Sequence, residues 1–295
     1  MQEHDWKQAI RNLLVLLRDY VRGLALLTKR PRLAEELHDL ERQLKELESN
    51  LAKERPETRK LEKQRQRRLP VGGVRFGDLR RVRPISRRFG FDRGKAIDRY
   101  YIESFLARHA DDVRGRVLEI GDNSYTRRYG GSRVIVSDVL NVAEGNPRAT
   151  IVADLTRADH IPSDAFDCII FTQTLQFIYD ARSAIQTLYR ILKPGGILLA
   201  TVPGIGRMLD PSQDKWGVRY HWAFTLPSVL RLFEESFPSA NVEVETYGNV
   251  LAAISFLHGL AAEDLHQEEL DHREAGYDGY EVLIALRAVK PEDRL

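Results

Sequence analysis

Short apolar segments that alternate with helical ones constrain the fold of this chain more than any other feature. The apolar segments are rich in Val, Ile, Leu and Phe and have the length of strands. The alternation predicts an α/β fold, a mostly parallel sheet of seven strands with helices on both faces. The predicted strands are 116–120, 133–137, 149–152, 167–171, 197–202, 242–246 and 281–289, and the predicted helices are 100–109, 181–192, 226–237 and 250–262.

The first 69 residues carry a different pattern. Apolar residues recur at alternating spacings of four and three from Ile10 to Leu24, and again from Leu33 to Leu51. An apolar period of 3.5 residues is typical of a coiled coil. We therefore predict an α-helical coiled-coil extension and a homo-oligomer that forms through it. A helical hairpin that packs on its own globular domain is the alternative.

The sequence predicts three parts: a helical arm (1–69), a basic linker with an entry helix (70–115) and an α/β domain (116–295). Leu69-Pro-Val-Gly-Gly73 marks the first boundary, because Pro and Gly interrupt helices.

The net charge of +2 conceals a basic stretch, Lys53 to Arg93, with 15 basic and 5 acidic residues. This stretch is either a solvated, helix-extending face or a surface for an anionic partner, such as phospholipid head groups or a phosphate-bearing, lipid-linked glycan. Nucleic acid is disfavoured, because no aromatic residue lies between Lys53 and Arg75 to stack on bases.

Cysteine, histidine and hydropathy patterns exclude several classes of site. Cys168 is the single cysteine, so the chain forms no internal disulfide and no cysteine-rich zinc site. The histidines lack metal-ligand spacing, so no metal is expected. No apolar run reaches the ~18–20 residues of a membrane span. We expect a cytoplasmic protein, and contact with the inner face of the membrane is compatible with this expectation.

Small or acidic residues follow successive predicted strands. Gly121 follows the first strand, Asp138 the second, Asp154 the third, and Thr172-Gln173 the fourth. In parallel sheets, ligands bind beyond the carboxyl ends of the strands, where the strand order reverses. A glycine there permits a tight turn against a nucleotide-type ligand, and Asp138, 17 residues later, is placed to accept hydrogen bonds from ribose hydroxyls.

These residues carry a resemblance. Val117-Leu-Glu-Ile-Gly121, Asp138, Ala153-Asp-Leu155 and Leu192-Lys-Pro-Gly-Gly196 resemble motifs of the class I S-adenosylmethionine-dependent methyltransferases, over about residues 90–290. The stretch Trp222-Ala-Phe-Thr225 is similar to one in many of these enzymes. Arg88-Phe-Gly-Phe-Asp-Arg-Gly94, followed by Ile97-Asp-Arg-Tyr-Tyr101, resembles a subset found beside glycosyltransferases in bacterial polysaccharide pathways.

The resemblance implies a Rossmann-like sheet and S-adenosylmethionine as the cofactor. Asp138 would bind the ribose diol, Asp154 and Leu155 the adenine edge, and Thr172 and Gln173 would lie near the sulfonium. The implied cofactor contacts are Glu119, Gly121, Asp122, Asn123, Asp138, Val139, Asp154, Leu155, Thr172 and Gln173. The sequence departs from the family pattern where the usual Gly-x-Gly-x-Gly is reduced to Gly121.

The expected reaction is O-methylation of a sugar or glycan acceptor. We predict His221 as the base that takes the acceptor proton, since histidine titrates near neutral pH. Arg93, Tyr100 and Trp222 are the predicted acceptor contacts. A catalytically silent scaffold module and an RNA methyltransferase are the alternatives. A nicotinamide dehydrogenase is disfavoured, because the chain lacks the Gly-x-Gly-x-x-Gly loop.

Overall fold

The computed structural model describes Arg42 and residues 70–208, 219–273 and 279–292. The chain divides into two units, residues 1–77 and 78–295, and the second unit contains the sheet. The predicted coiled coil and the oligomer that depends on it lie outside the described residues, Arg42 apart, and stay predictions. Within the described ranges, no helix is long and apolar enough to cross a membrane.

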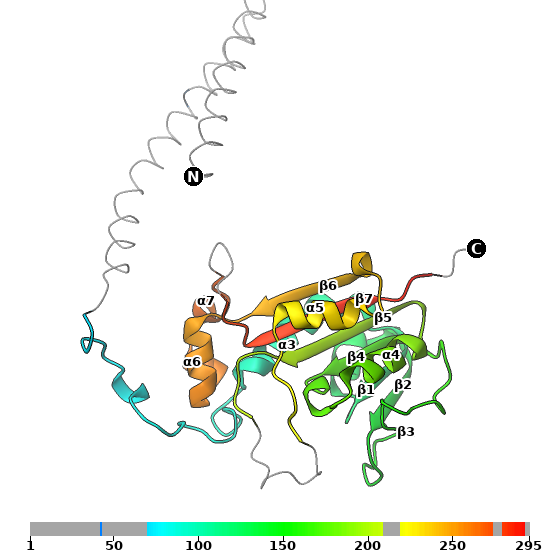
Figure 1. Ribbon diagram of the computed structural model, residues 1–295, viewed down its shortest axis with the longest axis horizontal. Helices are drawn as coiled ribbons and strands as arrows, with labels where there is room; N and C mark the ends of the chain where they lie inside the picture. The colour runs from blue at the N-terminus through cyan, green and yellow to red at the C-terminus, as the bar shows by residue number, and fades with distance from the viewer. Residues whose placement is uncertain (1–41, 43–69, 209–218, 274–278, 293–295) are drawn as a thin grey trace, which may run out of the picture. The chain divides into compact units, whose positions relative to one another are not determined.

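The second unit is built around a seven-stranded sheet with the order β3-β2-β1-β4-β5-β7-β6 (Figure 1). Only β7 runs antiparallel to its neighbours, so the sheet is mostly parallel, as predicted. The strands are β1 (Gly115–Ile120), β2 (Val134–Asn141), β3 (Ile151–Val152), β4 (Phe166–Thr172), β5 (Leu192–Pro203), β6 (Val242–Tyr247) and β7 (Leu283–Val289). The helices are α3 (Ile97–Arg108), α4 (Ala181–Ile191), α5 (Leu226–Glu234), α6 (Val250–His258) and α7 (Gln267–Leu270).

Helices cover both faces of the sheet because strand side chains alternate between two cores (Figure 1). In β4, Ile169 and Phe171 belong to the core beneath α4 and α5, and Cys168 and Ile170 to the core beneath α3 and α6. Helix α3 precedes the sheet in sequence and packs in the second core, so the predicted entry helix is part of the second unit.

The chain reverses its direction of travel across the sheet between β1 and β4. Strands β2 and β3 lie on one side of β1, and β4 and β5 lie on the other. The carboxyl ends of β1 and β4 therefore flank the switch point of the sheet, where parallel sheets bind ligands.

Strand β5 begins at Leu192, five residues before its predicted start at Ile197. Strand β2 departs from the expected bounds at its other end. We predicted its end at Ser137, but it continues through Asp138, Val139 and Leu140 to Asn141. An acidic residue is disfavoured in a strand. Here the acid has partners within the fold, described below, and the strand continues into buried Val139 and Leu140.

Candidate functional site

The turn after β1 leaves open space above its backbone. Gly121 has φ +81°, a left-handed conformation that favours glycine, and a Cβ built on it meets nothing within 4 Å. Its N–H donates to the Leu140 carbonyl at 2.9 Å, and its own carbonyl accepts from Asn146 Nδ2 at 2.7 Å. The turn is thus fixed to β2 and to the loop after β2 while its outer side stays free for a ligand.

Glu119 holds the loop that follows this turn. Its carboxylate accepts hydrogen bonds from the Tyr125 and Thr126 backbone N–H groups, at 3.2 and 2.7 Å, and from Thr126 Oγ1 at 2.7 Å. The side chain is buried, and burial raises its pKa to about 7. Glu119 therefore lies beneath the predicted cofactor loop and holds it in place from inside the protein.

Asp122 and Asn123 complete the loop by local contacts. The Asp122 carboxylate accepts from the Ser124 N–H at 2.9 Å and from Ser124 Oγ at 2.8 Å. Asn123 Nδ2 donates to Ser137 Oγ at 3.1 Å. These hydrogen bonds fix the loop in which Gly121 is the single glycine.

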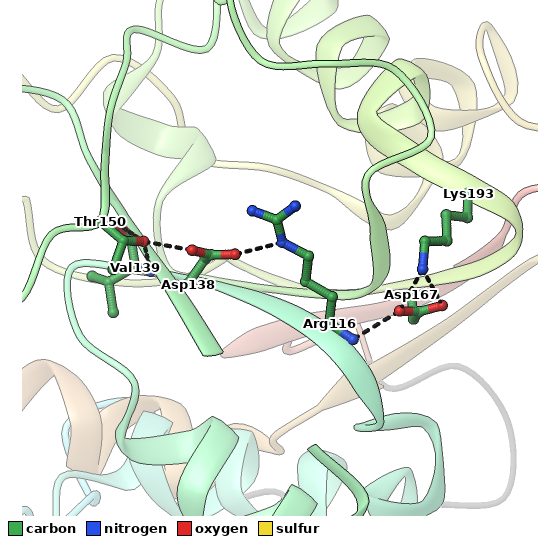
Figure 2. Close-up of polar contacts among 6 residues, drawn as sticks. All are labelled: Arg116, Asp138, Val139, Thr150, Asp167 and Lys193. Carbon is green, nitrogen blue, oxygen red and sulfur yellow. Dashed lines mark hydrogen bonds and ion pairs between the residues drawn. The ribbon is translucent and has the colours of Figure 1, made fainter. Parts of the chain in front are cut away.

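Asp138 does not lie at the carboxyl edge, where the ribose prediction had placed it. It pairs with Leu118 within the β1–β2 ladder, three residues before Asn141, which places it ~10 Å below the edge. Its carboxylate accepts from Arg116 Nε at 2.7 Å and from Thr150 Oγ1 at 2.8 Å (Figure 2).

Val139 fails as a cofactor contact for the same reason. It is buried within the strand, and its N–H donates to Thr150 Oγ1 at 3.0 Å. Figure 2 also shows that the Arg116 N–H reaches Asp167, which in turn accepts from Lys193 Nζ at 2.8 and 2.9 Å. This polar cluster ties four strands together and has a structural role.

Asn141 and Val142 occupy the edge position that we had assigned to Asp138. Asn141 ends β2, and its Nδ2 donates to the Ala143 carbonyl at 2.6 Å, so its Oδ1 can accept from a ligand hydroxyl. The Val142 side chain is 60% exposed and offers an apolar surface beside it. No acid marked this position in the sequence, which is why we missed it.

Asp154 and Leu155 lie where we predicted, just beyond β3. The Ala153 N–H donates to the Asn141 carbonyl at 3.0 Å, so the segment that follows adjoins the end of β2. Asp154 accepts from the Thr156 N–H and hydroxyl at 2.9 and 2.8 Å, and its side chain stays 40% exposed. The Leu155 side chain is buried in the core, which leaves its backbone to face a ligand.

The end of β4 carries Thr172 and Gln173, as predicted. Gln173 has φ +47°, a left-handed conformation that costs free energy in a residue with a side chain. Its Oε1 accepts from Gln176 Nε2 at 3.1 Å. Gln176 is buried, and its own Oε1 has no hydrogen-bond partner among the described residues. A buried acceptor without a partner is costly unless a ligand supplies a donor.

A pocket of about 210 Å³ opens beside Gln173 and Gln176. Its walls combine aromatic rings with charged groups from segments far apart in sequence. The lining residues are Phe89, Phe91, Asp98, Arg99, Gln173, Gln176, Phe177, Pro203, Gly206, Arg207, Tyr220, Phe256 and Val282. We call it the edge pocket.

Asp98 and Arg99 begin α3 and supply the charge at the centre of the edge pocket. Burial raises the pKa of Asp98, which keeps a proton more readily than a solvated aspartate. Arg99 Nη1 donates to the Tyr125 hydroxyl at 2.9 Å, and Tyr125 ends the loop after Gly121. The edge pocket therefore adjoins the predicted cofactor loop.

Tyr220 and Arg207 close the other sides of the edge pocket. The Tyr220 ring packs edge-on against Phe177 with centroids 5.5 Å apart, and burial raises its pKa to about 12. Arg207 lies over the Phe89 ring, 5.4 Å from its centroid, and Nη1 donates to the Arg87 carbonyl at 2.6 Å.

His221 does not line the edge pocket, so its predicted role as the base lacks the required geometry. The side chain is exposed, and its ring packs against Tyr179 with centroids 5.4 Å apart. Successive residues of an extended chain point to opposite sides, so Tyr220 faces the pocket and its neighbour faces away.

The three predicted acceptor contacts also lie elsewhere. Arg93 forms a two-point ion pair with Asp264, at 2.7 and 3.0 Å, and the Tyr100 hydroxyl donates to Asp271 at 2.8 Å. Trp222 stacks on Tyr179 and lines a separate groove between α4 and α5. None of them is among the residues that line the edge pocket.

Comparison with known proteins finds similarity to methyltransferases. A family model described as "Methyltransferase domain" matches residues 125–200. Malonyl-[acyl-carrier protein] O-methyltransferase from Serratia marcescens is 27% identical over 218 residues, 68% of this chain and 83% of that protein. The Yersinia pestis protein of the same name is 28% identical over 170 residues, 53% of this chain and 61% of that protein.

One of the solved structures that are similar to this chain is an S-adenosylmethionine dependent methyltransferase from Mesorhizobium loti. It is 17% identical to this chain, with a TM-score of 0.44, and the match covers 66% of this chain and 98% of that one.

Proposed function

We propose that this chain, an S-adenosylmethionine-dependent methyltransferase, transfers the methyl group to a hydroxyl oxygen of a sugar or glycan. One observation carries the proposal: the edge pocket lies against the loop and strand ends that suit the cofactor, and it combines aromatic walls with a half-buried carboxylate. A hydroxyl acceptor needs both features, because it must be oriented and must lose a proton.

S-adenosylmethionine is the cofactor, and the residues at the sheet edge fit it. The open space above Gly121 admits a ligand against the backbone, and Asn141 and Asp154 offer acceptor oxygens at neighbouring strand ends. Exposed Val142 supplies apolar surface between them. When bound, the cofactor supplies an electrophilic methyl group on a sulfonium. The protein then has to orient the acceptor, exclude water and take up the proton.

The walls of the edge pocket suit a sugar. Phe89, Phe91 and Phe177 offer ring faces for the C–H faces of a pyranose, and Gln173 and Gln176 offer hydrogen-bonding groups for its hydroxyls. Gln176 Oε1 is buried without a partner among the described residues, so a rotation of the side chain toward the pocket would let it accept from an acceptor hydroxyl and relieve the cost of its burial.

We assign Asp98 as the base. Its carboxylate lines the edge pocket, and its raised pKa makes it a stronger base than a solvated aspartate. It takes the proton from the acceptor hydroxyl as the new carbon–oxygen bond forms. Tyr220 keeps its proton at neutral pH and can donate a hydrogen bond to the acceptor.

A carboxylate acceptor is the second candidate. The relatives are named as O-methyltransferases of a malonyl group, and malonyl carries a free carboxylate. Arg99 and Arg207 line the edge pocket and could pair with such an anion. A carboxylate is already deprotonated, so this reaction would not need Asp98 as a base.

Methyl transfer from S-adenosylmethionine with a tritiated methyl group separates these candidates. We expect label in a sugar or glycan, as a methyl ether that survives mild alkali. Release of the label by alkali would identify a methyl ester and favour the carboxylate acceptor. Label in RNA would favour the RNA methyltransferase, and no transfer to any of the three classes would favour the silent scaffold.

Phe177→Ala should abolish methyl transfer, because Phe177 lines the edge pocket. Trp222→Ala, in the separate groove, should not.

A further inference from the structure

Helix α6 presents an apolar face to solvent. Val250, Leu251, Ile254 and Leu257 recur at helical spacing and are 37–49% exposed. The opposite face, with Ala252, Ala253 and Phe256, is buried in the core. The helix is therefore apolar all round, although only half of it is covered by the described residues.

An arginine-rich segment, residues 80–88, is fixed to the carboxyl end of the same helix. The backbone N–H groups of Ile85 and Ser86 donate to the His258 carbonyl, at 2.8 and 3.1 Å. Gly90 has φ +91°, and a Cβ there would lie 2.5 Å from the Leu260 carbonyl oxygen, so the chain packs closely along this end. Figure 1 shows the segment passing beside one end of α6.

The arginines of this segment carry positive charge that is exposed to solvent. Five of them are exposed, and none forms an ion pair within the described part of the chain: Arg80, Arg81, Arg83, Arg87 and Arg88. The acids that follow α6 are already engaged. Asp264 pairs with Arg93, and Glu263 accepts from the Lys95 N–H at 2.9 Å. Arg88 helps to lower the pKa of Asp92, so this carboxylate offsets part of the charge. The five arginines still leave a net positive charge beside α6.

We propose that the outer face of α6 and the segment 80–88 together form a docking surface for an anionic lipid bilayer. Aliphatic side chains can enter the boundary between head groups and acyl chains, while neighbouring arginines pair with lipid phosphates. Nucleic acid offers phosphate but no aliphatic phase for these four side chains. The combination of aliphatic face and free arginines therefore favours a bilayer.

The edge pocket shares residues with this surface. Phe256 lines it from the inner face of α6, and Phe91, which is 52% exposed, lines it from the segment after the arginines. Arg207, another lining residue, donates to the Arg87 carbonyl. A bilayer on α6 would thus lie beside the pocket. If the proposed function holds, the acceptor is a lipid-linked glycan.

A fluorescence experiment on the full chain tests the docking surface without any acceptor. Cys168 is buried, so a Leu257→Cys variant can be labelled selectively with an environment-sensitive dye. With vesicles that contain 30% phosphatidylglycerol in phosphatidylcholine, we expect a blue shift of the dye emission. The matched control is Ile135→Cys, which is 84% exposed at the other end of the sheet and should not shift. Equal shifts at both positions, or none at Leu257, would overturn the proposal.

Vesicle binding measured by co-sedimentation separates α6 from the basic N-terminal arm. Arg87→Ala/Arg88→Ala should weaken binding about 30-fold, because each arginine near an anionic surface contributes on the order of a fivefold effect. Leu251→Gln/Ile254→Gln should weaken it more than tenfold.

Unchanged vesicle binding in both variants would overturn the proposal and assign the lipid contact to the arm. Tighter binding to RNA than to vesicles, or self-association through α6, would also overturn it. Inactivity toward glycans with intact vesicle binding would count against the proposed function alone.

Discussion

Asp98→Asn is expected to lower the turnover number about 10²–10⁴-fold, the range that a general base contributes to catalysis. The substitution keeps the size of the side chain and its acceptor oxygen for the Arg99 N–H, so α3 should fold as before. It removes the carboxylate that takes the acceptor proton. The measurement is the single-turnover rate of methyl transfer to the acceptor at saturating cofactor.

The pH profile and a matched variant show whether Asp98 acts as the base. The wild-type rate should rise with pH through the raised pKa of Asp98, because the carboxyl must be ionised to accept a proton. In Asp98→Asn this acid limb should be lost, with affinity for S-adenosylmethionine changed less than about threefold. His221→Gln should retain nearly full turnover, since His221 lies outside the edge pocket. Full turnover in Asp98→Asn and loss in His221→Gln would restore histidine as the base.

Gly121→Val should weaken S-adenosylmethionine binding more than about 100-fold. At φ +81° a β-branched residue is strained by ~1–2 kcal/mol, and its isopropyl group would fill the space above the turn. Loss of that space weakens cofactor binding directly, whereas the backbone strain lowers the stability of the folded protein. Calorimetric titration with the cofactor, together with urea unfolding, measures both effects.

Gly131→Val is the matched control for this substitution. Gly131 has φ +55° and open space at its Cβ position, but it precedes β2 at the opposite end of the sheet. With ψ −130° its backbone lies outside the left-handed helical region, so Gly131→Val should lose at least as much stability as Gly121→Val and keep its affinity for S-adenosylmethionine. Equal losses of affinity in the two variants would mean that strain, and not the space above Gly121, accounts for the effect.

The sequence predicted most of the sheet because its signals are local. The run Cys168-Ile-Ile-Phe171 supplies both cores from one strand. The stretch Lys193-Pro-Gly-Gly196 marks the end of α4, and in the structure it forms the first part of β5. Asp154 and Gln173 lie beyond strand ends as predicted for the same reason, since each comes within two residues of the end of an apolar strand.

The end of β2 was not predictable from local signals. We ended the strand at its first acid, but Asp138 is neutralised by Arg116, which is 22 residues away in sequence. That pairing lets the ladder continue to Asn141. Because β2 is four residues longer than predicted, the expected ribose contact is the Asn141 amide and no longer the Asp138 carboxylate.

The edge pocket depends on long-range packing, so its residues were assigned only in part. Asp98 and Arg99 come from a helix that precedes the sheet, and no spacing rule relates them to the strand ends. The sequence analysis singled out the stretch Ile97-Asp-Arg-Tyr-Tyr101, but we predicted Tyr100 from it as the acceptor contact and not Asp98 or Arg99. Likewise, Arg219-Tyr-His-Trp222 approaches the pocket, and Tyr220, not His221, lines it.

Calorimetric titration of S-adenosylmethionine into Asn141→Leu and Asp138→Asn tests most directly where the cofactor binds. The structure predicts that Asn141→Leu lowers the affinity at least about tenfold, because Asn141 stands at the carboxyl edge beside Gly121 and Asp154. Asp138→Asn should keep the affinity and lose stability, since Asp138 supports the strand from below. Lost affinity in Asp138→Asn with unchanged affinity in Asn141→Leu would contradict the site described here.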